Sequence, residues 1–399
     1  MTLYIIEAIR TPRGKAKAEG ALHPVLPANL LGQLYVELGK RLPVDALPID
    51  EVFTGCVTPI GDQGGNIGHT AMRLGNWNSP STGITLSSFC SSSLSTLSLA
   101  RSRLLAGEGN LYVSAGVESM SRAPLMSDKP YGFMDKHAGQ LIPVIPNPLF
   151  ADIVATRNDY NREQLDIYAL QSHQKAGRAT QARYFDRSLV PVVIDGITAL
   201  KHDELIRPHA TLDKLAALPP LFGERGVAGF EDVITRYFPE LMAVNHVHHA
   251  GNAPGMVDGA SLVLLGNTRA VQALEAKPRA RLVDISTRSA PAHLALSGGA
   301  AAAQHLLAKN NLKSSDIDLW EFNEGFAAVA CDFREQLKAP EDRFNVNGSG
   351  IAMGHAMGAT GGNLVSILCD ELERRDMCRG VVAISGAMGA GAAALIERD

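Results

Sequence analysis

The chain has 399 residues, of which 46% are hydrophobic and 20% are charged, so it is long enough for two or three domains with a large core. Its net charge of −4 argues against a nucleic-acid-binding surface, and no run of residues is apolar enough to predict a membrane span. The five cysteines form no C-x-x-C pair, so we expect no disulfide framework, no metal site, and a location in a reducing cytoplasm.

Short apolar segments alternate with helical stretches over most of the chain, which predicts an α/β architecture. Residues 122–244 break this alternation because they are rich in Pro, Asp, Arg and His, and we interpret them as an insertion carried by the N-terminal part. The expected strands are residues 3–6, 51–55, 83–87, 110–116, 280–287, 319–321 and 380–384, and the expected helices are residues 28–42, 92–106, 162–183 and 300–310.

The chain also contains a weak internal repeat. Cys90 is followed by a helix and a strand that ends in a Gly/Ser turn, and His355 is followed by a helical stretch and a strand that ends at Ser385. Two similar halves that face each other would bring both turns to one place.

Cys90 lies between the expected strand 83–87 and the expected helix 92–106. This order places its thiol at a helix N-terminus, where partial positive charge favours the thiolate. The position therefore predicts a nucleophile that accepts an acyl group. A small buried cysteine without a chemical role is the alternative interpretation.

Three further segments carry groups that could act with such a thiol. His355 lies among many glycines, where a neutral imidazole could take the thiol proton and later polarise a thioester oxygen. Asn323 and Glu324 end a strand, where the amide could hold a water or a carbonyl. Residues 381–391 form a strand and a Gly-rich turn whose backbone N–H groups suit an oxyanion hole. The alternatives are a histidine that fills a polar gap, a helix cap and a plain hairpin.

In type, order and spacing these segments resemble the thiolases, the family of acetyl-CoA acetyltransferases and 3-ketoacyl-CoA thiolases. The resemblance covers nearly the whole chain. It implies two similar βαβαβαββ halves packed as a five-layered αβαβα core, and a homodimer or homotetramer. The N-terminal half would comprise residues 1–121 and 245–275, the C-terminal half residues 276–399, and residues 122–244 would be a loop domain that covers CoA. Other matching segments are residues 10–15, 116–124, 162–166, 172–176, 250–252 and 258–260.

The resemblance implies an acyl-CoA C-acyltransferase that moves an acyl group between 3-ketoacyl-CoA or acetyl-CoA and CoA. CoA esters would be substrates, with no tightly bound cofactor. Cys90 would carry the acyl group as a thioester, and His355 would activate it and donate to the thioester oxygen. Asn323 would hold a water in the same oxyanion hole. The backbone N–H groups of Cys90 and Ala387 would form a second hole for the acyl-enzyme carbonyl.

Ser385 departs from the family pattern because it stands where a second catalytic cysteine is usual. That cysteine moves the proton at the carbon alpha to the thioester, and a serine hydroxyl is a far weaker acid than a thiol. The alternatives are an acyl-CoA hydrolase, a CoA-ester binder without C–C bond chemistry, or an engineered Cys→Ser change. Acyl-chain length stays open.

The resemblance places the candidate CoA contacts at Gly251, Asn252 and Pro254, of which Pro254 replaces a usual serine. Alternate histidines at 246 and 248, followed by His249, could suggest a metal site, but the resemblance gives none. Positively charged side chains that could meet CoA phosphates, or that are simply solvated, are Lys15, Lys17 and Arg225.

Overall fold

The computed structural model describes residues 1–43, 46–77, 80–223 and 229–398, and its N-terminal half follows the predicted βαβαβαββ order. Strands β3 and β4 are parallel, as are β3 and β5, whereas β8 is antiparallel to both β1 and β5. The spatial order is β1-β8-β5-β3-β4. In chain order the elements are β1 (Tyr4–Arg10), β2 (Gly14–Lys15), α1 (Pro27–Arg41), β3 (Glu51–Gly55), α2 (Ile67–Leu74), β4 (Thr82–Leu86), α3 (Ser92–Ala106), β5 (Leu111–Ser119), β8 (Val257–Gly266) and α11 (Thr268–Ala273).

The C-terminal half repeats this plan with the spatial order β10-β11-β12-β9. At the place that corresponds to β4, Phe344 forms only an isolated parallel bridge with Trp320. The next residue, Asn345, has a φ of 43°, and this left-handed turn takes the chain out of the extended conformation. The elements are β9 (Ala280–Ser289), α12 (Gly298–Lys309), β10 (Leu319–Phe322), α13 (Ala327–Leu337), α14 (Gly350–Met353), α15 (Thr360–Arg375), β11 (Arg379–Ser385) and β12 (Ala390–Glu397).

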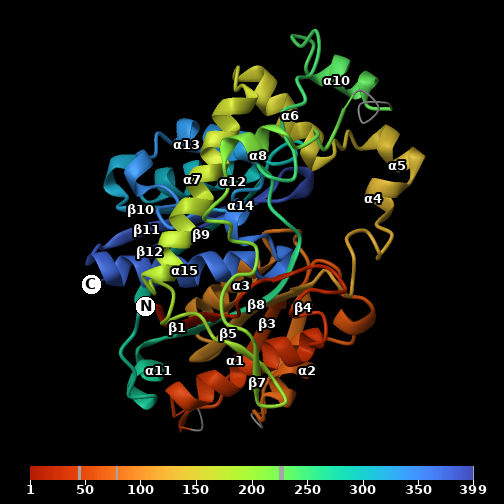
Figure 1. Cartoon of the computed structure of the whole chain (residues 1–399). Coiled ribbons are helices and arrows are strands. Elements are labelled where there is room, and N and C mark those ends of the chain that lie inside the picture. Colours follow the sequence, from red (N-terminus) through yellow and green to blue (C-terminus); the bar gives the residue numbers. More distant parts are fainter. Residues whose placement is uncertain (44–45, 78–79, 224–228, 399) are drawn as a thin grey trace.

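The two halves pack as the predicted five layers (Figure 1). Helices α1 and α2 cover the outer face of the N-terminal strands, and α12 covers the outer face of the C-terminal strands. Helices α3 and α15 contact each other and lie between the two sets of strands. A short pairing of Tyr4 and Ile5 with Arg281 and Ala280 joins β1 to β9, so both sets form one continuous sheet.

The inserted segment lies over one side of this core, where α7 contacts α13 and α14 (Figure 1). Its helix α7 begins and ends close to the predicted bounds, but the rest has more regular structure than the sequence indicates. No helix in the described ranges is long and apolar enough to cross a membrane. The elements are α4 (Tyr131–Met134), α5 (Lys136–Leu141), α6 (Asn147–Arg157), α7 (Arg162–Gln181), β6 (Val192–Ile194), β7 (Ile197–Leu200), α8 (Leu212–Ala216) and α10 (Glu231–Tyr237).

Candidate active site

Cys90 lies in the turn between β4 and α3, as the sequence predicts. The preceding residue, Phe89, has a φ of 53°, a left-handed conformation that bends the chain sharply. Ser91 is the N-cap of α3, and the Ser88 backbone N–H donates to the Ser92 hydroxyl at 3.0 Å. This turn holds Cys90, which is 8% exposed, at the N-terminal end of α3.

The pKa of the Cys90 thiol is raised to about 12, first by burial and then by the negative charge of Glu118. The backbone N–H groups of Ala387 and of Cys90 itself act in the opposite direction and lower the pKa. The sequence expectation of a thiolate stabilised by the helix N-terminus is therefore wrong for the free protein, because desolvation outweighs these donors. Cys90 is a neutral thiol at pH 7 and requires a base.

The backbone N–H groups of Cys90 and Ala387 are the two that the resemblance to the thiolases assigns to an oxyanion hole. Ala387 begins the turn that joins β11 to β12. Gly386 allows this turn to lie close to the nucleophile, since a Cβ at Gly386 would be 3.3 Å from Cβ of Phe89 and 3.4 Å from N of Cys90. An acyl oxygen on the Cys90 sulfur would thus lie beside both donors.

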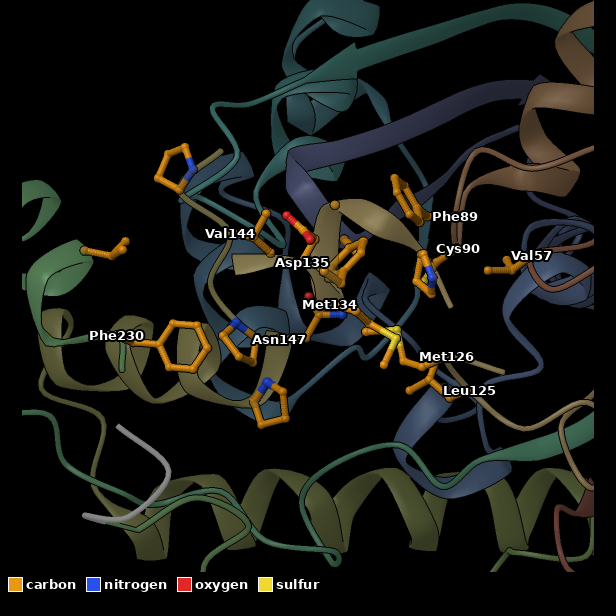
Figure 2. A pocket seen from close by; sticks show the side chains of 18 of the residues that line it. Val57, Phe89, Cys90, Leu125, Met126, Met134, Asp135, Val144, Asn147 and Phe230 are labelled. Carbon is orange, nitrogen blue, oxygen red and sulfur yellow. The ribbon is translucent and has the colours of Figure 1, made fainter. Parts of the chain in front are cut away.

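Cys90 and Ala387 line a cavity of about 1120 Å³, and Figure 2 shows it between the core and the inserted segment. Met357 also lines it, as do residues of α4, α5 and α10. His355, Asn323 and Ser385 are not among its described lining residues. The segments of His355 and Ser385 therefore contribute to the cavity wall through Met357 and Ala387, each of which lies two residues further along the chain.

His355 lies between α14 and α15. Its backbone N–H donates to the carbonyl of Gly255 at 2.9 Å, and its Nδ1 lies 2.8 Å from the Thr360 hydroxyl, which leaves Nε2 for a substrate. Arg13 donates to the carbonyl of Gly354 at 2.7 Å. The pKa of His355 is lowered to about 4, first by burial and then by the charge of Arg13. At pH 7 the imidazole is the neutral base that the sequence analysis expects.

A close crossing of α3 and α15 brings the Cys90 and His355 segments together. The Gly362 N–H donates to the Ser93 hydroxyl at 3.0 Å. A Cβ at Gly361 would lie 2.7 Å from Cγ of Leu94, so a larger residue would push the helices apart. Because Cys90 and His355 each precede one of these helices, thiol and imidazole lie at the same end of the central layer.

Asn323 and Ser385 lie at the carboxyl ends of the adjacent parallel strands β10 and β11. The Asn323 backbone N–H donates to the carbonyl of Ala383 at 3.1 Å. The Asn323 residue is 2% exposed, yet its Oδ1 has no hydrogen-bond partner among the residues that the structure describes. An unsatisfied buried amide oxygen is unfavourable, and a water or substrate group would satisfy it.

Glu324 holds the Asn323 segment in place. Its carboxylate accepts hydrogen bonds from the hydroxyls of Tyr168 at 3.0 Å and Ser172 at 2.7 Å, and from the backbone N–H of Ile351 at 3.1 Å. These donors come from α7 and α14, so Glu324 orients its neighbours.

Ser385 is 5% exposed, and its Oγ accepts a hydrogen bond from the N–H of Gly299, at 2.9 Å, near the start of α12. A Cβ at Gly299 would lie 2.6 Å from this oxygen, so the close approach requires glycine. Cys378 immediately precedes β11 and is exposed, and Cys331 lies on α13. Neither thiol lies at the strand end that Ser385 occupies.

Glu118 is a central residue of the site for which the sequence analysis proposes no role. Its buried carboxylate accepts hydrogen bonds from the N–H groups of Val57 at 2.9 Å and Gly358 at 3.0 Å, and from the Gln63 amide at 3.0 Å. Val57 and the neighbour of Gly358 both line the cavity. Glu118 thus connects two loops on either side of Cys90. A lone acidic residue at the end of an apolar strand was the signal available in the sequence.

The structure corrects two of the three predicted CoA contacts. Asn252 is fully buried, and its amide donates to Asp166 at 2.9 Å and to the carbonyl of Val247 at 3.1 Å. Gly251 packs against Leu215, since a Cβ there would lie 2.5 Å from Cδ2 of that leucine. Both residues are used within the protein, whereas Pro254 is half-buried. Arg225 lies outside the described residues.

The histidines at 246–249 are held by carboxylates. His246 and His248 place Nδ1 at 2.9 and 2.8 Å from the carboxylate of Asp152, and His249 places Nε2 at 2.6 Å from Asp166. In the described part of the chain, no group of three or more His, Cys, Asp or Glu side chains could hold a metal ion. These contacts explain the histidines as structural residues.

Comparison with known proteins shows the same architecture in one family. The N-terminal domain of thiolase matches residues 3–229, and the C-terminal domain of thiolase matches residues 276–398. The β-ketoadipyl-CoA thiolase of Pseudomonas knackmussii is 32% identical over 99% of both chains, and so is the 3-oxoadipyl-CoA/3-oxo-5,6-dehydrosuberyl-CoA thiolase of Escherichia coli. The crystal structure of human mitochondrial 3-ketoacyl-CoA thiolase in complex with CoA superposes with a TM-score of 0.86 and 26% identity, over 100% of this chain and 98% of the human chain.

Proposed function

Because this chain belongs to the thiolase family and is an acyl-CoA C-acyltransferase, we propose that Cys90 carries the acyl group between two CoA thiols. The observation that carries this proposal is the position of the Cys90 thiol on the wall of the cavity next to Ala387, with the backbone N–H groups of both residues lowering its pKa. A buried thiol that serves only in packing would not need to lie on the wall of a large cavity beside backbone N–H donors.

In the first half-reaction His355 takes the Cys90 proton, and the sulfur attacks the 3-keto carbon of a 3-ketoacyl-CoA. The bond between C2 and C3 breaks, the acyl group stays on sulfur, and the electron pair leaves on C2 of acetyl-CoA. In the second half-reaction a CoA thiol gives its proton to the Ser385 oxygen and attacks the Cys90 thioester. The new acyl-CoA leaves, and His355 returns its proton to the Cys90 sulfur. The N–H groups of Cys90 and Ala387 stabilise the tetrahedral oxyanion, at about 3 kcal/mol per donor.

The enolate of the leaving acetyl-CoA requires its own donors and a proton. We assign its oxygen to Nε2 of His355 and to a water held by Asn323, whose Oδ1 lacks a partner. Ser385 donates the proton to C2, directly or through a water. The Gly299 N–H occupies one acceptor site of its oxygen, which directs the hydroxyl hydrogen away from α12. Because a hydroxyl is a weak acid, this proton transfer limits the rate.

We also propose that CoA esters bind in the cavity as substrates, without a tightly bound cofactor, and that Pro254 lies at the edge of the CoA site. The human relative, whose structure contains CoA, supports this assignment. A homodimer or homotetramer in the cytoplasm is the form in which we expect the enzyme to act.

The test is thiolysis of acetoacetyl-CoA by free CoA, with Cys90→Ala as the control. We expect two molecules of acetyl-CoA for each acetoacetyl-CoA consumed by the wild type, and no product with the variant. Release of free acetate and acetoacetate without acetyl-CoA would instead show a hydrolase and overturn the proposal.

A further inference from the structure

We propose that the cavity above Cys90 selects 3-ketoacyl-CoA substrates whose acyl tail is apolar and uncharged, and that α4 with its flanking residues sets this choice. The inference rests on the proposed function, because it takes Cys90 as the acyl carrier. It goes further in assigning the chemical class of the tail and the element that recognises it.

Helix α4 (Tyr131–Met134) covers the side of the cavity next to the nucleophile, and we call it the roof of the cavity. The Phe133 ring packs edge-on against the ring of Phe89, with centroids 5.9 Å apart at an angle of 79°. A Cβ at Gly132 would lie 3.9 Å from Cε of Met388, which directly follows Ala387. The roof therefore contacts both the Cys90 turn and the oxyanion turn, and a tail attached to Cys90 must pass beneath it.

The surface that such a tail would meet is apolar. Val57, Phe89, Met126, Phe133 and Met134 line the cavity near Cys90, and Figure 2 shows the two methionines close to the nucleophile. Met134 is 60% exposed, an unusual state for a large apolar side chain in a cavity wall. An alkyl tail would cover this sulfur-containing surface, and methionines adapt to tails of different shape. Each added methylene that is buried improves binding about fourfold, equivalent to about 0.8 kcal/mol.

The charges in the cavity oppose a tail that ends in a carboxylate. Asp128 and Asp135 line the cavity, and Asp135 accepts the N–H groups of His137 at 2.9 Å and Ala138 at 3.0 Å. This capping holds the Asp135 carboxylate in place, so a second carboxylate nearby would be repelled.

The positive charge of the cavity lies at its other end. Among the lining residues that the structure describes, Arg236 alone is cationic, and it belongs to α10 together with Tyr237, over whose ring it stacks at 5.4 Å. Figure 2 shows Phe230, next to α10, far across the cavity from Cys90. This position leaves the tail region without that cation, and Asp232 on the same helix adds a further negative charge to the cavity lining. We therefore expect this chain to prefer other substrates than the relatives named for β-ketoadipyl-CoA and 3-oxoadipyl-CoA, whose acyl group ends in a carboxylate.

The experiment compares two substrates that differ only at the end of the tail. Thiolysis of 3-oxohexanoyl-CoA and of 3-oxoadipyl-CoA is measured with the full chain, and acetoacetyl-CoA serves as a reference for the proposed function itself. We expect kcat/KM to be at least about 100-fold higher for 3-oxohexanoyl-CoA, about 2.7 kcal/mol. Equal values, or a preference for 3-oxoadipyl-CoA, would overturn the inference.

A charge placed in the roof tests whether α4 makes the selection. Met134→Arg should raise kcat/KM for 3-oxoadipyl-CoA about tenfold and lower it for 3-oxohexanoyl-CoA. The matched control is Met242→Arg, at a fully exposed methionine outside the cavity, which should leave the ratio unchanged. A folded Met134→Arg protein with the wild-type ratio would show that another element makes the choice.

A binding measurement separates this inference from the proposed chemistry. With Cys90→Ala protein, titration calorimetry compares the saturated hexanoyl-CoA with adipyl-CoA, and neither ligand can be cleaved. Tighter binding of hexanoyl-CoA supports the selection even if no thiolysis occurs, and equal affinities contradict it even if acetoacetyl-CoA is cleaved.

Discussion

Replacing Ser385 by cysteine should accelerate the carbon–carbon bond chemistry. Ser385 lies at the end of β11, and its oxygen lies 2.9 Å from the backbone N of Gly299, so a larger sulfur at this place must shift slightly. A thiol is a far stronger acid than a hydroxyl, and burial raises the pKa of either group at position 385, so the thiol stays the better proton donor to C2. General acid–base catalysis contributes about 10²–10⁴-fold, so we expect kcat for thiolysis to rise at least about 100-fold.

The assay is steady-state thiolysis of acetoacetyl-CoA, combined with the pre-steady-state rate of Cys90 acylation. The exposed Ser102, changed to cysteine, is the control for an added thiol. Overpacking beside Gly299 should lower the free energy of unfolding by only about 1 kcal/mol. An unchanged kcat in a folded Ser385→Cys protein would refute the reasoning, because position 385 would then not deliver the proton.

Three further predictions concern the residues around Cys90. Glu118→Gln turns one acceptor into a donor that faces N–H groups, so the free energy of unfolding should fall by about 2–3 kcal/mol. Loss of the negative charge should also shift the pH dependence of Cys90 alkylation by iodoacetamide to lower pH. An unchanged pH dependence of alkylation would contradict the role of Glu118. The pKa of His355 is lowered from its usual 6.5 to about 4 in the folded protein, so the stability that the neutral imidazole contributes is complete above pH 6.5 and is lost as the pH falls toward 4. Urea unfolding from pH 4 to 7 should show this slope in the wild type and a smaller one in His355→Asn, and equal slopes would oppose it. Asn323→Ala should lower kcat about 100-fold because the water that donates to the enolate oxygen loses its holder. The free energy of unfolding should change little, since the substitution removes an unsatisfied buried oxygen. An unchanged kcat in steady-state assays would exclude a catalytic water held by Asn323.

Strands β1, β3, β4, β5, β9, β10 and β11 overlap strands expected from the sequence, because apolar runs and Gly-rich turns are local signals, whereas β8 and β12 were not among the expected strands. The helices α3 and α7 begin at the expected residues, and α3 ends one residue before Gly107, whose φ of 74° suits a helix C-terminus. In the C-terminal half, an isolated bridge at Phe344 takes the place of the strand that corresponds to β4. The sequence did not show this difference, because the apolar pattern around Phe344 is too short to distinguish a strand from a bridge.

The chemistry of individual site residues depends on contacts that no local pattern contains. The pKa of Cys90 rises because distant segments exclude water from it, so the helix N-terminus alone indicates the wrong direction. Glu118 meets groups from around residues 57 and 358, which only the packing of β3, β5 and the His355 segment brings together. Asn252 faces inward for a similar reason, since its partner Asp166 comes from α7.

The central claim is that the acyl group travels on Cys90. The most direct measurement is peptide mass spectrometry of the protein quenched in acid after brief exposure to acetoacetyl-CoA without free CoA. The account predicts one acetyl group on the peptide that contains Cys90, and its disappearance when CoA is added. Acetylation of Cys56, Cys331, Cys369 or Cys378 instead, or no acetyl group on any cysteine while the substrate is consumed, would contradict it.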